Sequence, residues 1–223
     1  MSDFPPNLCI RPLTVEDVDQ SLLLEKALFP EGERCSPETI KYRLTVCPEL
    51  CSGLFIREYI PKYKEINLPE IADKQRKEVS EYEEDSDDDH KDIPGKTSVI
   101  KETLIGHVLA TKINGSRITN ESMELPRKDN ELTGHHELSR TIGVHSVCIS
   151  PSWKGKNLGT LMLHDYVQKL SNQDLGDQIV IIVHAELIKF YSKIGFVNLG
   201  ISQCNFSGSE WYDMAIDLVR EDD

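Results

Sequence analysis

The chain has 223 residues, of which 39% are hydrophobic and 28% are charged, a balance typical of a soluble globular protein with one sizeable core. Its net charge of −13 argues against nucleic-acid binding, which needs Lys and Arg to neutralise phosphates, and favours attraction of cationic molecules. No apolar run reaches the length of a membrane span and no signal peptide is recognisable, so we expect no membrane contact and a cytoplasmic location. The six cysteines lack paired metal-ligand spacing, which predicts reduced thiols and no metal site.

Acidic residues are concentrated in one segment. Residues 78–92 contain nine acids and one lysine. Such a run cannot bury enough apolar surface to fold, and it lies in a stretch far longer than a turn between two strands needs. The sequence therefore predicts a single domain over residues 1–223, with a disordered acidic insertion at about 60–98.

The N-terminal part of the chain indicates a short strand and two helices. The strand covers Cys9–Leu13. Thr14 and Asp17 have the spacing of a capping box for the first helix. Ser36 followed by Pro37 is an N-cap with proline at the first helical position, which predicts a second helix there. Two further strands are predicted at Leu50–Tyr59 and Leu104–Lys112.

Strands and helices alternate in the C-terminal half. A β-branched run, Ile142–Ile149, predicts a buried strand that ends at Pro151, and an apolar stripe at helical spacing begins at Leu158. Ile179–Val183 predicts a buried parallel strand, and Gly195 closes the helix after it. The last two strands are placed at Phe196–Gln203 and Trp211–Leu218, and a polar connection at Asn114–Ser139.

The stretch from the central strand to the following helix predicts an anion site. The first N–H groups of a helix have no partner in the chain, and the helix dipole favours negative charge beside them. Gly155 and Gly159 let the backbone approach a pyrophosphate closely, while Lys154 and Lys156 add positive charge. Strand, glycine-containing loop and helix N-terminus together suit a phosphorylated cofactor.

Three stretches carry a resemblance to a known family. The loop from Lys154 to Gly159, KGKNLG, resembles the coenzyme A loop Q/R-x-x-G-x-G/A of the GNAT acetyltransferases. Asn157 replaces the usual first glycine, and Asn is the non-glycine residue that best tolerates a positive φ. LIKFYSKIGF at Leu187–Phe196 resembles the family's second signature. CPELCSGLF at Cys47–Phe55 resembles a segment of the arylalkylamine N-acetyltransferases, and the chain looks closest to their fungal branch, which includes polyamine acetyltransferases.

This resemblance implies an α/β fold: a mixed central sheet with helices on both faces and a splayed pair of parallel strands that binds coenzyme A. It also implies acetyl-CoA as co-substrate, a small primary amine as acceptor and a monomeric chain. In the family the strand before the loop pairs with the pantetheine arm, and the loop holds the pyrophosphate. The residues then expected to bind coenzyme A are Val147, Cys148, Ile149, Lys154, Gly155, Lys156, Asn157, Leu158, Gly159 and Thr160.

Acetyl transfer to an amine requires the amine to lose a proton. A primary ammonium has a pKa near about 10, so about one molecule in a thousand is nucleophilic at neutral pH, and a histidine is the natural base. His145 falls on the second of two active-site histidines in the vertebrate enzymes, whereas the first falls on Gly143. His184, at the end of the next strand, is a second candidate base or substrate-orienting group. Both also suit structural roles.

The remaining expected site residues come from the resemblance. Tyr191 falls on the family's phenol, which protonates the leaving thiolate; a purely packing tyrosine is the alternative. The residues between and after the first two helices form the roof of the amine site in the family. That places Phe29, Pro30, Cys47 and Pro48 near the substrate, although ordinary helix punctuation explains them equally well.

The favoured function is a small-amine N-acetyltransferase with direct transfer, with His145 as base and Tyr191 as acid. The amine is either an arylalkylamine or a polyamine. One alternative is an acetyltransferase of protein N-termini or lysines, and another is a catalytically silent acyl-CoA-binding module. The segment at Cys47–Phe55 favours the first over the second, and retention of both His145 and Tyr191 favours an enzyme over a silent module.

Overall fold

The structure is a computed structural model that describes residues 4–59 and 99–219. The insertion predicted at about 60–98 lies outside the described residues.

The N-terminal elements begin and end where their capping signals place them. Thr14 and Asp17 form the predicted capping box, and the Ser36 side chain accepts a hydrogen bond from the Thr39 backbone N–H at 3.1 Å. The first helix ends before Phe29, whose extended backbone forms its C-cap. The elements are β1 (Leu8–Pro12), α1 (Val18–Leu28), α2 (Pro37–Val46), β2 (Ser52–Tyr59) and β3 (Val99–Ile113).

The C-terminal half contains the predicted elements and one more. The additional element is α4, a single helical turn in the long polar connection, capped by Thr119 and Ser122. Gly195 ends α6 with a φ of 118°, as its position after the apolar stripe predicts. The elements are α4 (Asn120–Met123), β4 (Thr141–Ile149), α5 (Leu158–Asn172), β5 (Gln178–Val183), α6 (Ile188–Ile194), β6 (Val197–Ile201) and β7 (Tyr212–Asp217).

The strands form one mixed sheet in the order β1-β2-β3-β4-β5-β7-β6. The pair β4 and β5 is parallel, whereas β3 with β4 and β5 with β7 are antiparallel. Pairing between β4 and β5 runs only from Thr141 and Gln178 to Val144 and Ile181, although β4 continues to Ile149. The ends of these two parallel strands therefore splay apart, which confirms the predicted fold class.

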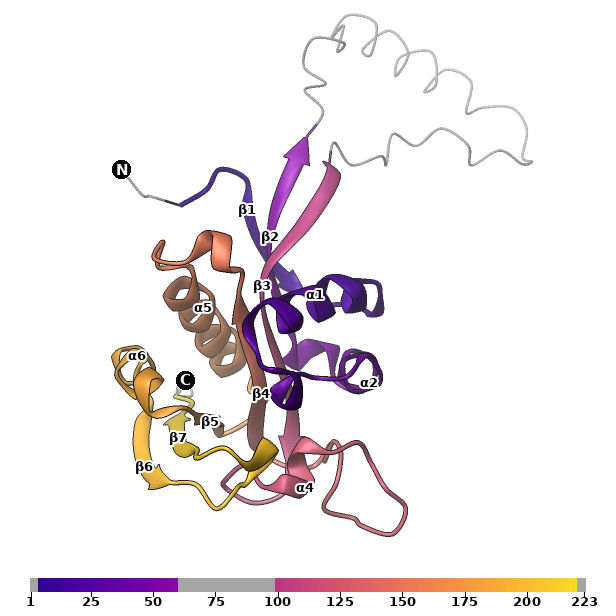
Figure 1. Ribbon diagram of the computed structural model, residues 1–223, viewed down its shortest axis with the longest axis vertical. Coiled ribbons are helices and arrows are strands. Elements are labelled where there is room, and N and C mark those ends of the chain that lie inside the picture. Colours follow the sequence, from indigo (N-terminus) through magenta and orange to yellow (C-terminus); the bar gives the residue numbers. More distant parts are fainter. Residues whose placement is uncertain (1–3, 60–98, 220–223) are drawn as a thin grey trace, which may run out of the picture. The chain divides into compact units, whose positions relative to one another are not determined.

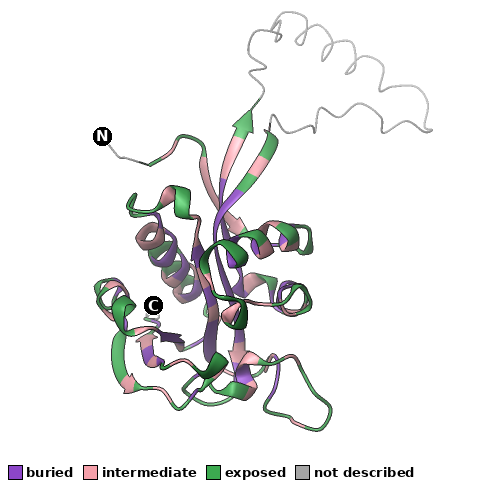
Figure 2. Ribbon diagram, in the orientation of Figure 1, coloured by how far each residue is buried: buried purple, intermediate pink, exposed green. Residues whose placement is uncertain are grey.

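Helices cover both faces of the sheet. Figure 1 shows α1 and α2 on one face and α5 and α6 on the other. Each pair contributes to a separate core cluster. Leu24 of α1 and Ile40 and Leu44 of α2 belong to one, and Met162 and Tyr166 of α5 and Tyr191 of α6 belong to the other. Figure 2 shows the central strands as the buried layer between them. In the described part of the chain, the helices are too short or too polar to cross a membrane.

The chain divides into two compact units. Of the described residues, one unit contains 4–56 and 103–219, and the other contains 57–59 and 99–102. In the second unit, Arg57 pairs with Glu102 at 2.7 Å and Lys101 pairs with Glu58 at 3.3 Å.

Candidate active site

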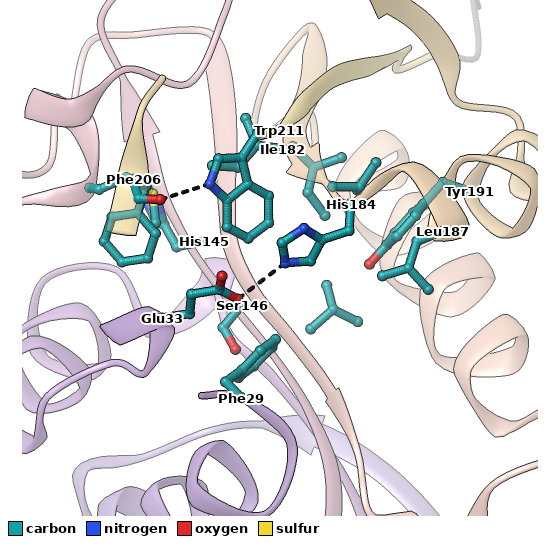
Figure 3. A pocket seen from close by; sticks show the side chains of 14 residues that line it. Phe29, Glu33, His145, Ser146, Ile182, His184, Leu187, Tyr191, Phe206 and Trp211 are labelled. Atoms are coloured by element: carbon teal, nitrogen blue, oxygen red, sulfur yellow. Dashed lines mark hydrogen bonds and ion pairs between the residues drawn. The ribbon is translucent and has the colours of Figure 1, made fainter. Parts of the chain in front are cut away.

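A cavity open to solvent lies at the splayed ends of β4 and β5 (Figure 3). Its wall also includes the loop between α1 and α2, the turn before α6 and the segment before β7. The lining residues are Phe29, Glu33, Met123, His145, Ser146, Val147, Ile181, Ile182, Val183, His184, Leu187, Tyr191, Phe206 and Trp211. All three residues predicted to act in catalysis are therefore in one place.

His145 is directed into the cavity wall by a β-bulge. The register of β3 against β4 shifts by one residue between Val144 and Ser146, so His145 is the extra residue on its strand. Its Nε2 lies 2.7 Å from Thr111 Oγ1 and its Nδ1 lies 3.2 Å from Met123 Sδ. Both ring nitrogens thus have protein partners.

The environment of His145 disfavours its charged form. Burial, and secondly the positive charge of Arg43, hold the pKa of His145 well below its ordinary value. The ring is consequently neutral at neutral pH. A low pKa makes an imidazole a weaker proton acceptor, so the structure gives less support to His145 as a base than the sequence does.

His184 is held in a different way. It follows β5, and its Nε2 lies 3.1 Å from Glu33 Oε2, on the loop between α1 and α2. Its ring stacks on Trp211 with centroids 4.1 Å apart and planes at 27°. The Glu33 side chain is only 7% exposed, and its other oxygen accepts a hydrogen bond from Ser209 Oγ at 2.7 Å. A carboxylate that orients an imidazole in this way also stabilises the imidazolium.

Tyr191, on α6, contributes a buried phenol to the same cavity. Its ring makes edge contacts with Phe190 and Phe196, with centroids 5.0 and 5.6 Å away. Burial raises the pKa of the phenol well above its ordinary value, so the hydroxyl remains protonated at neutral pH. A protonated phenol can donate a proton to a leaving group, although a raised pKa makes it a weaker acid than a free phenol.

The predicted anion loop contains two residues with a positive φ, Gly155 and Asn157. Asn157 adopts the left-handed region with φ 56° and ψ 17°, immediately before α5 begins at Leu158. Gly155 has φ 80° and open space where a Cβ would stand. At Gly159 a Cβ would lie 3.3 Å from the Phe190 ring, which leaves little room for a larger residue. Lys156 lies over the Trp153 ring at 5.1 Å.

The other residues expected to bind coenzyme A divide into two groups. Val147 lines the cavity and Ile149 is half-buried, whereas the Cys148 side chain is fully buried against the α1 and α2 face of the sheet. The thiol of Cys148 is thus a core group, and burial raises its pKa. In the loop and first turn, Leu158 is buried and Thr160 is half-buried, while Lys154 is exposed.

Only one of the four expected amine-site residues lies in the cavity wall. Phe29 lines the cavity, but Pro30, Cys47 and Pro48 are not among the lining residues. Cys47 is fully buried, and its thiol donates to the Ala110 carbonyl at 3.3 Å. Pro48 is exposed and begins a 3-10 turn.

Sequence reasoning did not identify several residues of the cavity. Glu33 and Trp211 flank His184, and Ser146 lies between His145 and Val147 in the wall. Each partner is far from His184 in the chain, so no local spacing indicates the contact. The polar character of Ser146, beside His145 in a largely apolar strand, is the one available signal.

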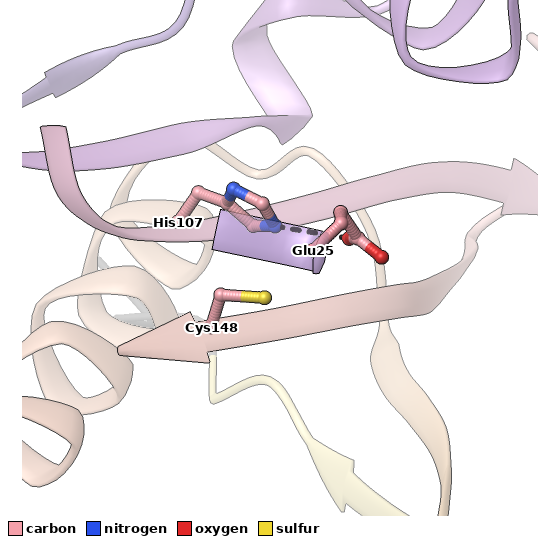
Figure 4. A group of neighbouring side chains, drawn as sticks. All are labelled: Glu25, His107 and Cys148. Atoms are coloured by element: carbon pink, nitrogen blue, oxygen red, sulfur yellow. Dashed lines mark hydrogen bonds and ion pairs between the residues drawn. The ribbon is translucent and has the colours of Figure 1, made fainter. Parts of the chain in front are cut away.

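A second polar cluster lies beside the cavity, within the core. Glu25, His107 and Cys148 each offer a possible ligand atom within 4.8 Å of the others (Figure 4). His107 Nε2 and both oxygens of Glu25 already have hydrogen-bond partners. A metal also requires a thiolate, and burial raises the pKa of the Cys148 thiol. The donor set therefore suits a hydrogen-bond network better than a metal site.

Comparisons with known proteins identify the fold and the family. Three solved structures share the fold, each at 13% identity: the loading GNATL domain of CurA from Lyngbya majuscula, the GphF GNAT-like decarboxylase in complex with isobutyryl-CoA, and Arabidopsis thaliana NAA60 in complex with a bisubstrate analogue. Their TM-scores are 0.61, 0.59 and 0.53. The matches cover 95%, 95% and 94% of this chain, and 98%, 100% and 97% of those chains.

A search of curated proteins gives no significant match. The family model described as an acetyltransferase (GNAT) domain matches residues 79–218. Together with the mixed sheet and its splayed parallel strands, this match establishes that the chain belongs to the GNAT acetyltransferases.

Proposed function

We propose that the protein transfers an acetyl group from acetyl-CoA directly to a small primary amine. The observation that carries the proposal is the cavity at the splayed strand ends, which combines a histidine paired with a carboxylate, His184 with Glu33, and a buried phenol, Tyr191. A proton acceptor and a proton donor in one cavity are what acetyl transfer from a thioester to an ammonium requires.

Acetyl-CoA is assigned to the splayed strands and the anion loop. The outer part of β4, from Val147 to Ile149, has a backbone edge that β5 does not pair, which suits the amides of a pantetheine arm. The loop from Lys154 to Thr160 follows directly and offers free N–H groups at the start of α5. The GphF structure, with isobutyryl-CoA bound to the same fold, supports this choice of cofactor.

The cavity favours an amine with one cationic group and an apolar body. Phe29, Met123, Phe206 and Trp211 give it an aromatic and apolar wall, and among the described lining residues Glu33 is the sole acid. A polyamine carries several cations that each need a partner, whereas an arylalkylamine carries one. We therefore propose an arylalkylamine as the preferred acceptor and spermidine-like amines as weaker ones.

The proposed chemistry begins with removal of an ammonium proton. His184 accepts it, and Glu33 stabilises the resulting imidazolium. His145 is the second candidate for this role, although its low pKa makes it the weaker base. The free amine nitrogen then attacks the thioester carbonyl carbon, the C–S bond breaks, and Tyr191 donates its proton to the departing thiolate. The acetylated nitrogen loses its second proton to the Tyr191 phenolate, which restores the phenol and leaves a neutral amide and a thiol.

A thiol-release assay with acetyl-CoA tests this proposal. Wild type should acetylate tryptamine faster than spermidine, and both faster than a short peptide with a free N-terminus. His184→Gln should lower kcat at neutral pH by about a hundredfold or more, and raising the pH towards 9 should restore part of it by supplying free amine. Preference for the peptide would support the protein N-terminal alternative, and coenzyme A binding without turnover of any acceptor would support a silent module.

A further inference from the structure

A buried hydrogen-bond network connects the core to the cavity through Ser146. Glu25 on α1 and His107 on β3 are fully buried, and Ser146 on β4 is 4% exposed. The Ser146 hydroxyl donates to Glu25 Oε1 at 2.5 Å, and His107 Nε2 lies 3.2 Å from that oxygen and 3.1 Å from Ser146 Oγ. The second oxygen of Glu25 accepts from the Cys35 backbone N–H at 3.0 Å.

The carboxylate at the centre of this network is charged. Burial alone would raise the pKa of Glu25, but hydrogen bonds with His107, Ser146 and the Cys35 N–H outweigh it, and the pKa lies below its ordinary value. A buried anion costs free energy that apolar packing at the same position would avoid. In addition, His107 Nδ1 is buried with no hydrogen-bond partner among the described residues. The network is therefore more polar than core packing requires.

The carboxylate determines what Ser146 can offer to the cavity. A serine hydroxyl has one hydrogen to donate and two lone pairs to accept. Because the hydrogen is directed to Glu25, the oxygen can act only as an acceptor towards anything else. One lone pair faces His107 Nε2 at 3.1 Å, and Cys148 Sγ, a weak donor, lies 3.6 Å away, so a substrate N–H would take the second lone pair. Ser146 lines the same cavity as Phe29, Glu33 and His184, and Figure 3 labels all four.

We propose that Ser146 Oγ is an acceptor for the N–H groups of the substrate amine, with Glu25 as a buried counter-charge behind it and His107 as the residue that positions the carboxylate. This inference rests on the proposed function and adds a binding residue to it. The ammonium group would then be held on β4 by Ser146, while His184 approaches it from β5 to take its proton. A group that can only accept a hydrogen bond suits an amine, whose N–H groups donate. It disfavours a ligand that presents only an acceptor, such as a carbonyl oxygen.

Steady-state kinetics of full-length Ser146→Ala with tryptamine and acetyl-CoA test the inference. Loss of a hydrogen bond to a charged group should raise the KM for tryptamine by about tenfold to a hundredfold, with the KM for acetyl-CoA within about twofold of wild type. Ser146→Thr keeps the hydroxyl and should stay close to wild type. Ser146→Cys is similar in size but a weak acceptor, so it should resemble Ser146→Ala.

Ser21→Ala is the matched control. Ser21 is a fully buried serine on α1 whose hydroxyl has no hydrogen-bond partner among the described residues, so its loss should change neither KM. Thermal melting with coenzyme A confirms that each variant folds. If wild type is active and both Ser146→Ala and Ser146→Cys keep the wild-type KM for tryptamine, this inference alone is overturned. A folded wild type that acetylates neither tryptamine nor spermidine overturns the proposed function, and this inference with it.

Discussion

His145 and His184 line the same cavity, but the groups around them differ in charge. His145 is enclosed by β3 and α4 and contacts a hydroxyl and a thioether, neither of which carries charge. His184 contacts a carboxylate and an indole. An imidazole that must gain a proton is helped by an anion and hindered by burial near a cation. The same residue type is therefore a neutral wall residue at one position and, in the proposed mechanism, the proton acceptor at the other.

The low pKa of His145 predicts a specific pH dependence of stability. The unfolded chain protonates this histidine near its ordinary pKa of about 6.5, whereas the folded protein does so only at lower pH. Between these two values the unfolded state binds more protons, so stability falls as the pH falls, by at most about 1.4 kcal/mol per pH unit for one site.

Chemical denaturation from pH 7 to pH 5 measures this effect. His145→Gln should show a shallower loss of unfolding free energy across that range than wild type. His164→Gln, at an exposed position on α5, is the matched control for removal of one histidine. Equal slopes for the two variants would contradict the prediction.

Local sequence signals explain where most helices begin and end. They do not explain features that depend on contacts between distant segments. Caps at Thr14 and Ser36, and the positive-φ residue Asn157, act within a few residues, so the sequence alone places the ends of these helices. The β-bulge at His145 depends on how β3 pairs with β4, and α4 owes its place to packing of Met123 near that bulge. The bulge has no local pattern, and the single turn of α4 has only its Thr119–Ser122 cap, a weak signal within a polar connection.

The anion loop gives an element-level prediction at Asn157. Glycine tolerates the left-handed region without cost, whereas a β-branched residue there costs about 1–2 kcal/mol. Asn157→Val should therefore destabilise the protein by that amount and misplace the N–H groups at the start of α5, weakening coenzyme A binding. Asn157→Gly is the matched variant and should keep both properties. Calorimetric titration with coenzyme A provides the measurement, and unchanged affinity in Asn157→Val would remove the loop from the cofactor site.

At the scale of the molecule, the site is assembled from segments that are distant in sequence. Glu33, His184 and Ser209 are joined by two hydrogen bonds, although more than 150 residues separate the first two. Sequence reasoning found His184 because a strand end has a recognisable pattern. It did not find Glu33 or Glu25, since an acid on a helix or loop is ordinarily a solvated surface group. The family resemblance predicted the sheet, the loop and Tyr191, whereas these long-range partners required the fold.

The contact between Glu33 and His184 gives the last prediction. If Glu33 orients His184 and stabilises its imidazolium, Glu33→Gln should lower kcat by about tenfold to a hundredfold, because the amide supplies no charge. The KM for acetyl-CoA should not change, since Glu33 lies on the loop between α1 and α2, away from the anion loop at the start of α5. The defect should shrink towards pH 9, where the solvent supplies deprotonated amine. Glu31→Gln changes an exposed acid in the same turn and controls for loss of negative charge. A Glu33→Gln variant that loses activity equally at pH 7 and pH 9, or only as much as Glu31→Gln, would show that the carboxylate does not support proton transfer.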